Sequence, residues 1–572
     1  MISHRNRRIE VLRGPASLLY GGGAISGAVN LVDTRIPDQR PTGGIDGVFE
    51  LRGGTADDER TAVGGITVGA GPLALRAEGV YRDAEDYRAP DWEKRRVHGT
   101  FNETRTGTLG ASWIGENGYL GIAYTRQKSR YGVPGHNHDY EDCHPHGSAL
   151  HCGGHGHEED EHDHDNGGEE HADVSVDLRS ERFDLRGELR NPIAAVERVR
   201  LRAGFTDYRH HEIEGGHQVG DHGQGDDHDH GEEEGRTSFF NRGHDVRLEV
   251  EHAPLFGLRG VVGLQNSRSR FRTEGAEAFL PESVTRNTGL FLFESFDAGT
   301  IRFEIGARQE WQRIRTEDGH EAQHSPTSLS GAAIWRFAPG YSAALSVSRG
   351  ERAPTQQELF SRGIHLATNT FEIGNAALDT ETANSIDLTF RKTEGPTRVS
   401  IGLFRNHIDD YIFANTLDRF EDFRLIRYDQ RDARFTGIDG AIRHQVTPKL
   451  GLALFGDYVR AKFTGGGENL PRIPAGRLGV RADVRSGPVF GEVEAYRVFE
   501  QDGIADFETE TPGYNMVNLT LAYRLPIGPT RSEAFVRATN LLDELAFNHV
   551  SFVKEAAPLR GRNFVLGLRT AF

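Results

Sequence analysis

The sequence predicts an all-β protein, a 22-stranded antiparallel transmembrane β-barrel. Three observations indicate this fold: polar and apolar side chains alternate, the alternating segments are long, and short turns alternate with long polar connections. About 22 such segments lie between residues 45 and 572, an even number as in bacterial single-chain barrels. The chain contains no run of about 18 apolar residues of the kind that forms a membrane-spanning helix.

The alternation is clearest in four segments. In residues 301–311, IRFEIGARQEW, aliphatic and aromatic side chains alternate with arginine and glutamate. Residues 73–82, 198–205 and 246–251 repeat the pattern. Because a period of two places the two kinds of side chain on opposite faces of a strand, we expect one face of each strand to be densely charged.

Segment length and connection length separate a membrane barrel from a soluble β-protein. Many segments reach ten residues, whereas strands of globular sheets have about five or six. Short connections such as NPIAA and APGYS alternate with long polar ones, as expected for tight periplasmic turns and long outer loops. A soluble propeller or solenoid is the alternative, but no repeat of about 40 residues supports it.

The last ten residues, NFVLGLRTAF, predict a final strand. Phe564, Leu566, Leu568, Thr570 and the terminal Phe572 share one face of it. An alternating strand that ends on an aromatic residue resembles the closing strand of bacterial outer-membrane proteins, where it serves as an assembly signal. The segment therefore supports the barrel.

Two polar inserts interrupt the pattern, at residues 136–171 and 210–235. Together they hold 16 of the 26 histidines and 20 of the 85 acidic residues, and neither contains lysine or arginine. The formal net charge of −18 belongs to these inserts, since the rest of the chain has 67 basic and 65 acidic residues. We expect both inserts to be outer loops, supported by the barrel and without a core of their own.

Histidines in the inserts recur as His-x-His pairs, whose two rings share one face of an extended segment. Imidazole with nearby carboxylate suits zinc, copper or nickel, so we expect the inserts to capture a divalent metal. The alternative is a solvated loop in which histidine is incidental. The candidate ligands are His136, His138, His144, His146, His151, His155, His157, His162, His164, His171, His210, His211, His217, His222, His228 and His230.

The only two cysteines, Cys143 and Cys152, lie in the first insert. Two cysteines close together in a solvated segment favour a disulfide and an oxidising compartment. A pair of thiolate metal ligands is the alternative, although the C-x8-C spacing differs from the C-x-x-C that is common in zinc sites.

The first forty residues do not follow the barrel pattern. Residues 9–14 and 28–33 predict two short strands, and Pro15 suits the start of one or two helical turns between them. The glycines at 21–23 are expected to end those turns. A phosphate loop is disfavoured because its Lys-Ser or Lys-Thr is missing.

The run RIEVLRGPASLLYGGGAISGAVNLV resembles the end of the plug domain of TonB-dependent outer-membrane receptors. ERAPTQQELFSRG, GNAALDTETANSIDL and ATNLLDE, further along the chain, agree with that family. The resemblance implies that residues 1–40 are the C-terminal remnant of a plug and residues 41–572 are the barrel. It also implies a place in the lipid of the bacterial outer membrane and coupling to the TonB complex.

The family's plug is several times longer and is preceded by a TonB-contacting box and a signal peptide. Neither feature is found in MISHRNRR or the residues that follow it. We therefore expect that an amino-terminal portion is missing.

Within this family, the histidine-rich loops resemble those of the zinc-uptake members, which implies Zn²⁺ as the substrate. The family's transport site lies deeper, near the plug and the barrel mouth. We name Glu358, His365 and His549 as candidate ligands there. For each of them a structural or lumen-facing polar role is the alternative.

We therefore expect an outer-membrane receptor that captures Zn²⁺ on its inserts and imports it. One alternative is a receptor for haem or a metal chelate, and another is a surface metal-binding protein that transports nothing. No nucleophile–base set and no cofactor loop emerges, so we expect neither an enzyme nor a catalytic cofactor. We also expect no nucleic-acid partner.

Overall fold

The computed structural model describes residues 6–12, 14–21, 23, 27–135, 140, 142–152, 174–213, 236–275 and 278–572, with side chains from Ile9 onward. Within these ranges the regular structure is almost entirely β, and the one α-helix has five residues. No helix in the described ranges has both the length and the apolar character needed to cross a membrane.

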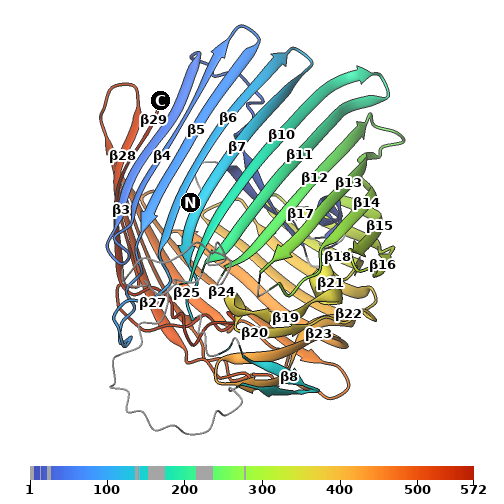
Figure 1. Cartoon of the computed structure of the whole chain (residues 1–572). Helices are drawn as coiled ribbons and strands as arrows, with labels where there is room; N and C mark the ends of the chain where they lie inside the picture. Colours follow the sequence, from blue (N-terminus) through green and yellow to red (C-terminus); the bar gives the residue numbers. More distant parts are fainter. Residues whose placement is uncertain are drawn as a thin grey trace, which may run out of the picture.

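Twenty-two strands form a closed antiparallel barrel, in which each strand pairs with its neighbours along the chain (Figure 1). They are β3 (Ile45–Gly54), β4 (Arg60–Ala70), β5 (Leu73–Ala84), β6 (Asn102–Gly115), β7 (Gly118–Gly132), β10 (Ser175–Ile193), β11 (Val196–Ile213), β12 (Arg236–His252), β13 (Arg259–Glu274), β14 (Ser283–Ala298), β15 (Ile301–Thr316), β17 (Thr327–Ala338), β18 (Tyr341–Arg352), β21 (Glu381–Lys392), β22 (Thr397–Phe420), β23 (Phe423–Gln445), β24 (Leu450–Phe463), β25 (Arg477–Ser486), β26 (Val489–Val498), β27 (Tyr514–Leu525), β28 (Arg531–Thr539) and β29 (Asn563–Ala571). Short elements in the connections are β8 (His144–His146), β9 (Ala149–His151), β16 (Glu321–His324), α1 (Gln356–Phe360), β19 (Arg362–His365), η3 (Leu366–Thr368) and β20 (Thr370–Ile373).

The barrel is closed by the pairing of its last strand with its first. β29 pairs antiparallel with β3 over seven residue pairs. The terminal residue extends this ladder, because the N–H of Gly47 donates to the carbonyl of Phe572 at 2.9 Å and the N–H of Phe572 donates to the carbonyl of Gly47 at 3.1 Å. Closure leaves no open sheet edge, which a β-structure at membrane depth requires.

The two faces of the barrel wall are the reverse of those of a soluble protein. On β15, Ile305 and Trp311 are 56% and 49% exposed, whereas Arg308 and Glu310 are only 4% and 6% exposed. The guanidinium of Arg308 donates to the carboxylate of Glu310 inside the barrel, at 2.7 Å from Nε. Apolar side chains therefore face outward and paired charges fill the lumen, as the period of two predicts.

Connections differ between the two ends of the barrel. At one end the strands are joined by short turns such as residues 116–117, 194–195 and 299–300. At the other end the connections are long, for example residues 133–174 and 353–380. By the rule for outer-membrane barrels the long connections are extracellular, and this end is called the mouth below.

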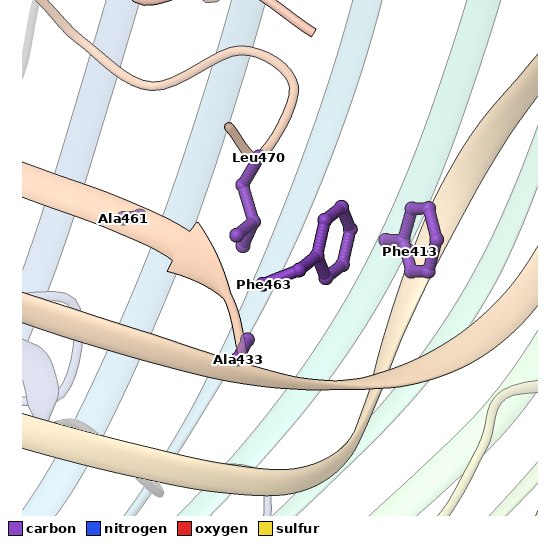
Figure 2. Close-up of a cluster of buried hydrophobic side chains, with 5 residues drawn as sticks. All are labelled: Phe413, Ala433, Ala461, Phe463 and Leu470. Carbon is purple, nitrogen blue, oxygen red and sulfur yellow. The ribbon is translucent and has the colours of Figure 1, made fainter. Parts of the chain in front are cut away.

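Buried apolar clusters in the described residues lie at the mouth, where long connections fold back onto strand ends. In the cluster of Figure 2, Phe413, Ala433, Ala461 and Phe463 come from β22, β23 and β24, and Leu470 comes from the following connection. Such clusters give these connections a fixed position, because burial of apolar surface stabilises their packing. The other clusters are Tyr140 with Cys143, Leu366 and Phe423; Ile314 with Leu359, Leu378 and Ile412; and Phe239 with Phe279 and Leu280.

An N-terminal unit lies inside the barrel (Figure 1). It consists of β1 (Asn6–Leu12), the 3-10 helix η1 (Gly14–Tyr20) and β2 (Ala28–Asp33), with β1 and β2 paired antiparallel. η1 packs against β14, β15, β17 and β18 of the wall. Pro15 lies next to Gly306 of β15, where a Cβ atom would come within 2.7 Å of the Pro15 carbonyl oxygen.

Charged groups of the wall hold this unit. Arg247 and Arg308 donate to the carbonyls of Leu19 and Leu18 at the end of η1, the second at 3.5 Å. Cations near the C-terminal carbonyls of a helix are favourable because those carbonyls lack partners within the helix. The N-terminal unit is thus held to the wall by polar contacts in addition to the packing of η1.

Asp33 at the end of β2 forms a second polar anchor. Its carboxylate accepts hydrogen bonds from Arg35 at 2.9 Å and from Arg186 of β10 at 2.7 Å. Burial alone would raise the pKa of Asp33, but the two guanidinium groups lower it to about 2. The carboxylate is therefore ionised at neutral pH and ties β2 to the wall.

The predicted 22-stranded barrel is confirmed. The helical turns predicted at Pro15 are present as a 3-10 helix. One local feature differs from the all-β prediction, because the short helix α1 lies in the ERAPTQQELF segment. A capping box explains α1: the Thr355 side chain accepts from the N–H of Glu358, and the Glu358 carboxylate accepts from the N–H of Thr355.

Substitution of Gly110 tests the fit between the wall and the residues that follow β2. A Cβ at this lumen-side position of β6 would lie 2.1 Å from the carbonyl oxygen of Arg35. Gly110→Ala is therefore expected to lower the free energy of unfolding by about 1–3 kcal/mol, the usual cost of overpacking. Denaturant unfolding in detergent, followed by tryptophan fluorescence, measures this loss.

Gly107→Ala is the matched control on the same strand, because a Cβ atom added there would meet no heavy atom within 4 Å. Equal stability of the two variants would contradict the close packing of Arg35 against β6.

Candidate functional site

The candidate metal ligands of the inserts fall into two groups. Five of them have described positions: His144, His146, His151, His210 and His211. The others lie outside the described residues: His136, His138, His155, His157, His162, His164, His171, His217, His222, His228 and His230.

Part of the first insert forms a hairpin rather than an irregular loop. β8 and β9 pair antiparallel, with His144 opposite His151 and His146 opposite Ala149. Gly147 has a φ of +66°, which a two-residue hairpin turn beginning with glycine requires. The hairpin lies at the mouth of the barrel (Figure 1).

Cys143 and Cys152 are joined by a disulfide, with an S–S distance of 2.01 Å. The bond closes the open end of the hairpin, since the two residues directly flank β8 and β9. Neither thiol is then available as a metal ligand.

The inner face of the hairpin is packed onto the barrel. Leu150 and Cys152 pack against the buried cluster that contains Cys143 and Phe423. The N–H of Leu150 also donates to the carboxylate of Asp418 on β22 at 2.7 Å. The hairpin is therefore a fixed platform, held by a disulfide, an apolar cluster and a hydrogen bond to the wall.

The outer face of the hairpin carries three exposed imidazoles. His144, His146 and His151 have ring centroids 5.0, 5.0 and 6.2 Å apart, the longest distance being between His144 and His151. The Nδ1 atom of His144 lies 2.8 Å from the carbonyl oxygen of Asp142. Because a carbonyl only accepts, Nδ1 of His144 carries the proton and Nε2 keeps its lone pair.

The second insert begins later than the sequence suggested. β11 extends to Ile213, so His210 and His211 belong to a barrel strand. The His210 ring stacks on Phe239 with centroids 4.3 Å apart, and Nδ1 of His211 lies 2.8 Å from the hydroxyl of Ser238. Neighbouring positions on a strand face opposite sides, so these two rings cannot share one ion in this strand.

Glu358 has a structural role. Its carboxylate accepts from both terminal nitrogens of Arg352, at 3.0 and 3.2 Å, and from the N–H of Thr355 at 2.7 Å. These contacts occupy the carboxylate in capping α1 and pairing Arg352. The structural alternative is therefore favoured over a ligand role for Glu358.

His365 has the geometry of a metal ligand with a supporting partner. Its Nδ1 lies 2.8 Å from the buried carboxylate of Glu372, and its ring stacks on Phe279 at 4.4 Å. Burial raises the pKa of Glu372, but the interaction with His365 and the hydrogen bonds from Gln357 and Tyr428 together outweigh this effect, and the net pKa is lowered. An imidazole that donates Nδ1–H to a carboxylate presents Nε2, the arrangement common in metal-bound histidine.

His549 is buried in a network between two outer connections. The Lys554 ammonium donates to the Thr511 hydroxyl oxygen at 3.0 Å, and Thr511 lies 2.8 Å from Nδ1 of His549. Thr511 can then donate its proton to Nδ1, which leaves the proton of a neutral ring on Nε2. Burial and the Lys554 charge lower the pKa of His549, so the ring is neutral and this network favours the structural alternative.

The described residues contain no group of three or more His, Cys, Asp or Glu side chains already placed to hold a metal ion. Glu358, His365 and His549 each contact different residues, so they do not form one site. Among the described candidates, His144 and His365 each have Nδ1 hydrogen-bonded to an oxygen atom, which leaves Nε2 to bind a metal.

A cavity of about 650 Å³ lies on the side of the N-terminal unit away from the mouth. It is bounded by β2, by the residues after β2 and by the ends of β10 and β11 that the short turn joins. Seven arginines and four acidic residues line it, and histidine is absent from its described lining. An excess of guanidinium groups disfavours a free cation there. The cavity is lined by Arg40, Arg76, Arg186, Arg190, Arg198, Arg200, Arg202, Asp33, Asp38, Asp46 and Glu188, among others.

Removal of the disulfide tests the fixed position of the hairpin. In the chain-entropy model a ring of this size stabilises by about 2.7 kcal/mol, so Cys143→Ser with Cys152→Ser is expected to open residues 143–152 to proteases. Limited proteolysis of the purified protein, with cleavage sites mapped by mass spectrometry, measures the change. Ser148→Ala in the hairpin turn is the control, and equal cleavage of both variants would contradict a disulfide-fixed hairpin.

Comparison with known proteins agrees with this architecture. The family model described as "TonB dependent receptor-like, beta-barrel" matches residues 64–541. The structure is similar to that of the copper transporter OprC, with 16% identity, a TM-score of 0.78, and coverage of 99% of this chain and 85% of that one.

Two further solved structures share the fold. The FrpB iron transporter from Neisseria meningitidis (F5-1 variant) is 12% identical with a TM-score of 0.75, covering 100% of this chain and 89% of that one. The siderophore receptor PirA from Acinetobacter baumannii is 14% identical with a TM-score of 0.71, and the match covers 99% of this chain and 85% of that one. Identities this low show the fold alone, whereas the family match spans most of the barrel. The chain belongs to the TonB-dependent receptor family of outer-membrane receptors and transporters.

Proposed function

We propose that this receptor captures a divalent transition-metal ion at its extracellular mouth and imports it, with Zn²⁺ as the favoured cargo. The observation that supports this most directly is the pair of histidine- and acid-rich inserts, which continue barrel strands at the mouth. A loop there is supported by the barrel, so its side chains are free to serve as ligands. Sixteen histidines without a single lysine or arginine exceed what an acidic solvated loop needs.

The available donor atoms favour a borderline divalent ion. The inserts supply imidazole and carboxylate, which suit Zn²⁺, Ni²⁺ or Cu²⁺. Soft sulfur ligands, which select Cu⁺, are scarce: the chain has two methionines, and its two cysteines form the disulfide. The similarity of the loops to those of zinc-uptake receptors then favours Zn²⁺ over the other two.

A path inward from the inserts needs further ligands. His365 with Glu372 is the best candidate, because its Nε2 is free and its partner carboxylate is ionised. It lies on β19, in a connection that folds onto β23 through the parallel pair of β20 and β23. An ion released from the outer histidines would therefore meet an imidazole on the barrel side of the mouth.

The final step requires movement of the N-terminal unit, which we assign to the family's plug. Polar contacts to Arg247, Arg308 and Arg186 help to hold the unit, and on movement water can replace the hydrogen bonds that are lost. No ATP is present at the outer membrane, and in this family the TonB complex supplies the work. Import should therefore depend on TonB.

Replacement of the inserts tests the proposal. Residues 153–171 and 214–235 are exchanged for glycine–serine segments of equal length, in a zinc-limited Gram-negative host that lacks other outer-membrane zinc receptors. Uptake of radioactive zinc at limiting concentration is expected to fall by at least about tenfold, because several tethered weak sites can together gain about 10²- to 10⁴-fold in affinity. Deletion of TonB should abolish uptake by the unaltered receptor.

Parallel assays with haem and with a ferric siderophore separate the alternative cargoes. Uptake of haem or the chelate without zinc uptake would replace the proposed cargo. Zinc binding without TonB-dependent uptake of any of these compounds would indicate a surface metal-binding protein. Unchanged zinc uptake after replacement would contradict a role of residues 153–171 and 214–235 in capture.

A further inference from the structure

We infer that the outer face of the β8–β9 hairpin is a metal-binding site in its own right, formed by His144, His146 and His151 for one divalent ion such as Zn²⁺. The inference rests on the proposed function and deepens it. The sequence predicts metal binding by sixteen insert histidines, and the inference places one binding site on three of them, which lie on a fixed hairpin. The other histidines of the inserts would deliver ions to this site or receive them from it.

Hairpin geometry brings the three rings together. His144 and His146 are two residues apart on β8 and share one face, and His151 is the partner of His144 on β9. All three are exposed, while the alternate positions Cys143, Leu150 and Cys152 pack toward the barrel. The hairpin therefore gathers its imidazoles on one side.

The spacing of the rings suits a single ion. A zinc–nitrogen bond of about 2.0–2.1 Å places each ring centroid about 3.2 Å from the metal, so tetrahedral ligands have centroids about 5 Å apart. Two of the three separations are 5.0 Å and the third is 6.2 Å. The ring nitrogens do not yet converge, and rotation of the His151 ring toward His144 about χ1 and χ2 would close the remaining gap while His144 keeps its hydrogen bond to Asp142.

The hydrogen bonding of His144 already selects a binding nitrogen. Its Nδ1–H donates to the Asp142 carbonyl at 2.8 Å, so Nε2 is the free nitrogen. Metal-bound histidines commonly donate their second ring N–H to a backbone carbonyl or a carboxylate, which fixes the tautomer and the ring orientation. His144 has this outer partner before an ion arrives.

The platform lowers the entropic cost of binding. The backbone of the hairpin is held by the Cys143–Cys152 disulfide and by the Leu150–Asp418 hydrogen bond, so only side-chain rotations are lost when an ion binds. A His-x-His pair in an unstructured segment would in addition lose backbone freedom, about 1–2 kcal/mol per residue ordered. The hairpin should therefore bind more tightly than such pairs.

Three protein ligands leave one tetrahedral position for water or another ligand. Sites of this kind exchange ligands more readily than closed four-ligand sites. An exchangeable position is what capture and release at a receptor mouth require. The chemistry excludes no borderline divalent ion, so Ni²⁺ and Cu²⁺ should compete with Zn²⁺.

The test uses the full chain with residues 153–171 and 214–235 replaced by glycine–serine segments, which leaves the hairpin and its disulfide intact. Calorimetry with Zn²⁺ is expected to find one tight site per chain, apart from weaker binding at His136, His138 and His365, which the replaced chain keeps. Co²⁺ should give the intense visible absorption of a tetrahedral site and be displaced by Zn²⁺. His144→Ala, His146→Ala and His151→Ala should each weaken Zn²⁺ binding by at least about tenfold, since even loss of an outer-shell partner costs about 10- to 100-fold.

His320→Ala and His98→Ala are matched controls, because each removes an exposed histidine that lies near a carboxylate and away from the hairpin. They should leave the affinity unchanged. Cys143→Ser with Cys152→Ser keeps all three imidazoles but frees the hairpin, and should weaken binding while the barrel stays folded in detergent.

Absence of a stoichiometric ion in the replaced chain, or equal affinity for the three hairpin variants and the two controls, would overturn the site. That failure is distinct from failure of the proposed function, which is read from TonB-dependent uptake by the unaltered receptor. Loss of the hairpin site with uptake intact would leave capture to the remaining insert histidines. An intact site without uptake would refute import alone.

Discussion

The structure depends on one constraint: at membrane depth every backbone N–H and C=O must find a partner within the protein. The chain meets it by pairing β29 with β3, so that 22 strands close without an edge. Once the backbone hydrogen bonds are made in this way, the side chains determine which face of the wall contacts lipid and which face lines the lumen. Ile305 and Trp311 can then face lipid while Arg308 and Glu310 pair in the lumen.

Closure also explains how the chain carries two inserts that could not fold alone. The strands supply the stability, and the connections need only local contacts to be placed. At the mouth these are apolar clusters and hydrogen bonds to strand ends, such as Leu150 to Asp418. The result is a rigid wall that carries exposed histidines at its mouth. This arrangement suits the proposed capture of an ion at the mouth and its release toward the lumen.

Features encoded locally could be predicted from the sequence, and features that depend on distant contacts could not. Alternation in residues 301–311 shows the strand and its faces directly. The pairing of His144 with His151 needed the hairpin, and that of His365 with Glu372 needed the β19–β20 pair. His210 was assigned to an insert because polarity, and not strand length, marked the boundary.

The most direct test of the account is whether the first and last strands are neighbours. Leu51→Cys on β3 and Leu568→Cys on β29 are register partners. In a chain whose native cysteines are replaced by serine, mild oxidation of membranes should join them and change the mobility of the denatured protein. Leu51→Cys with Leu345→Cys, on the distant strand β18, should not react. Cross-linking of both pairs or of neither would contradict a closed barrel.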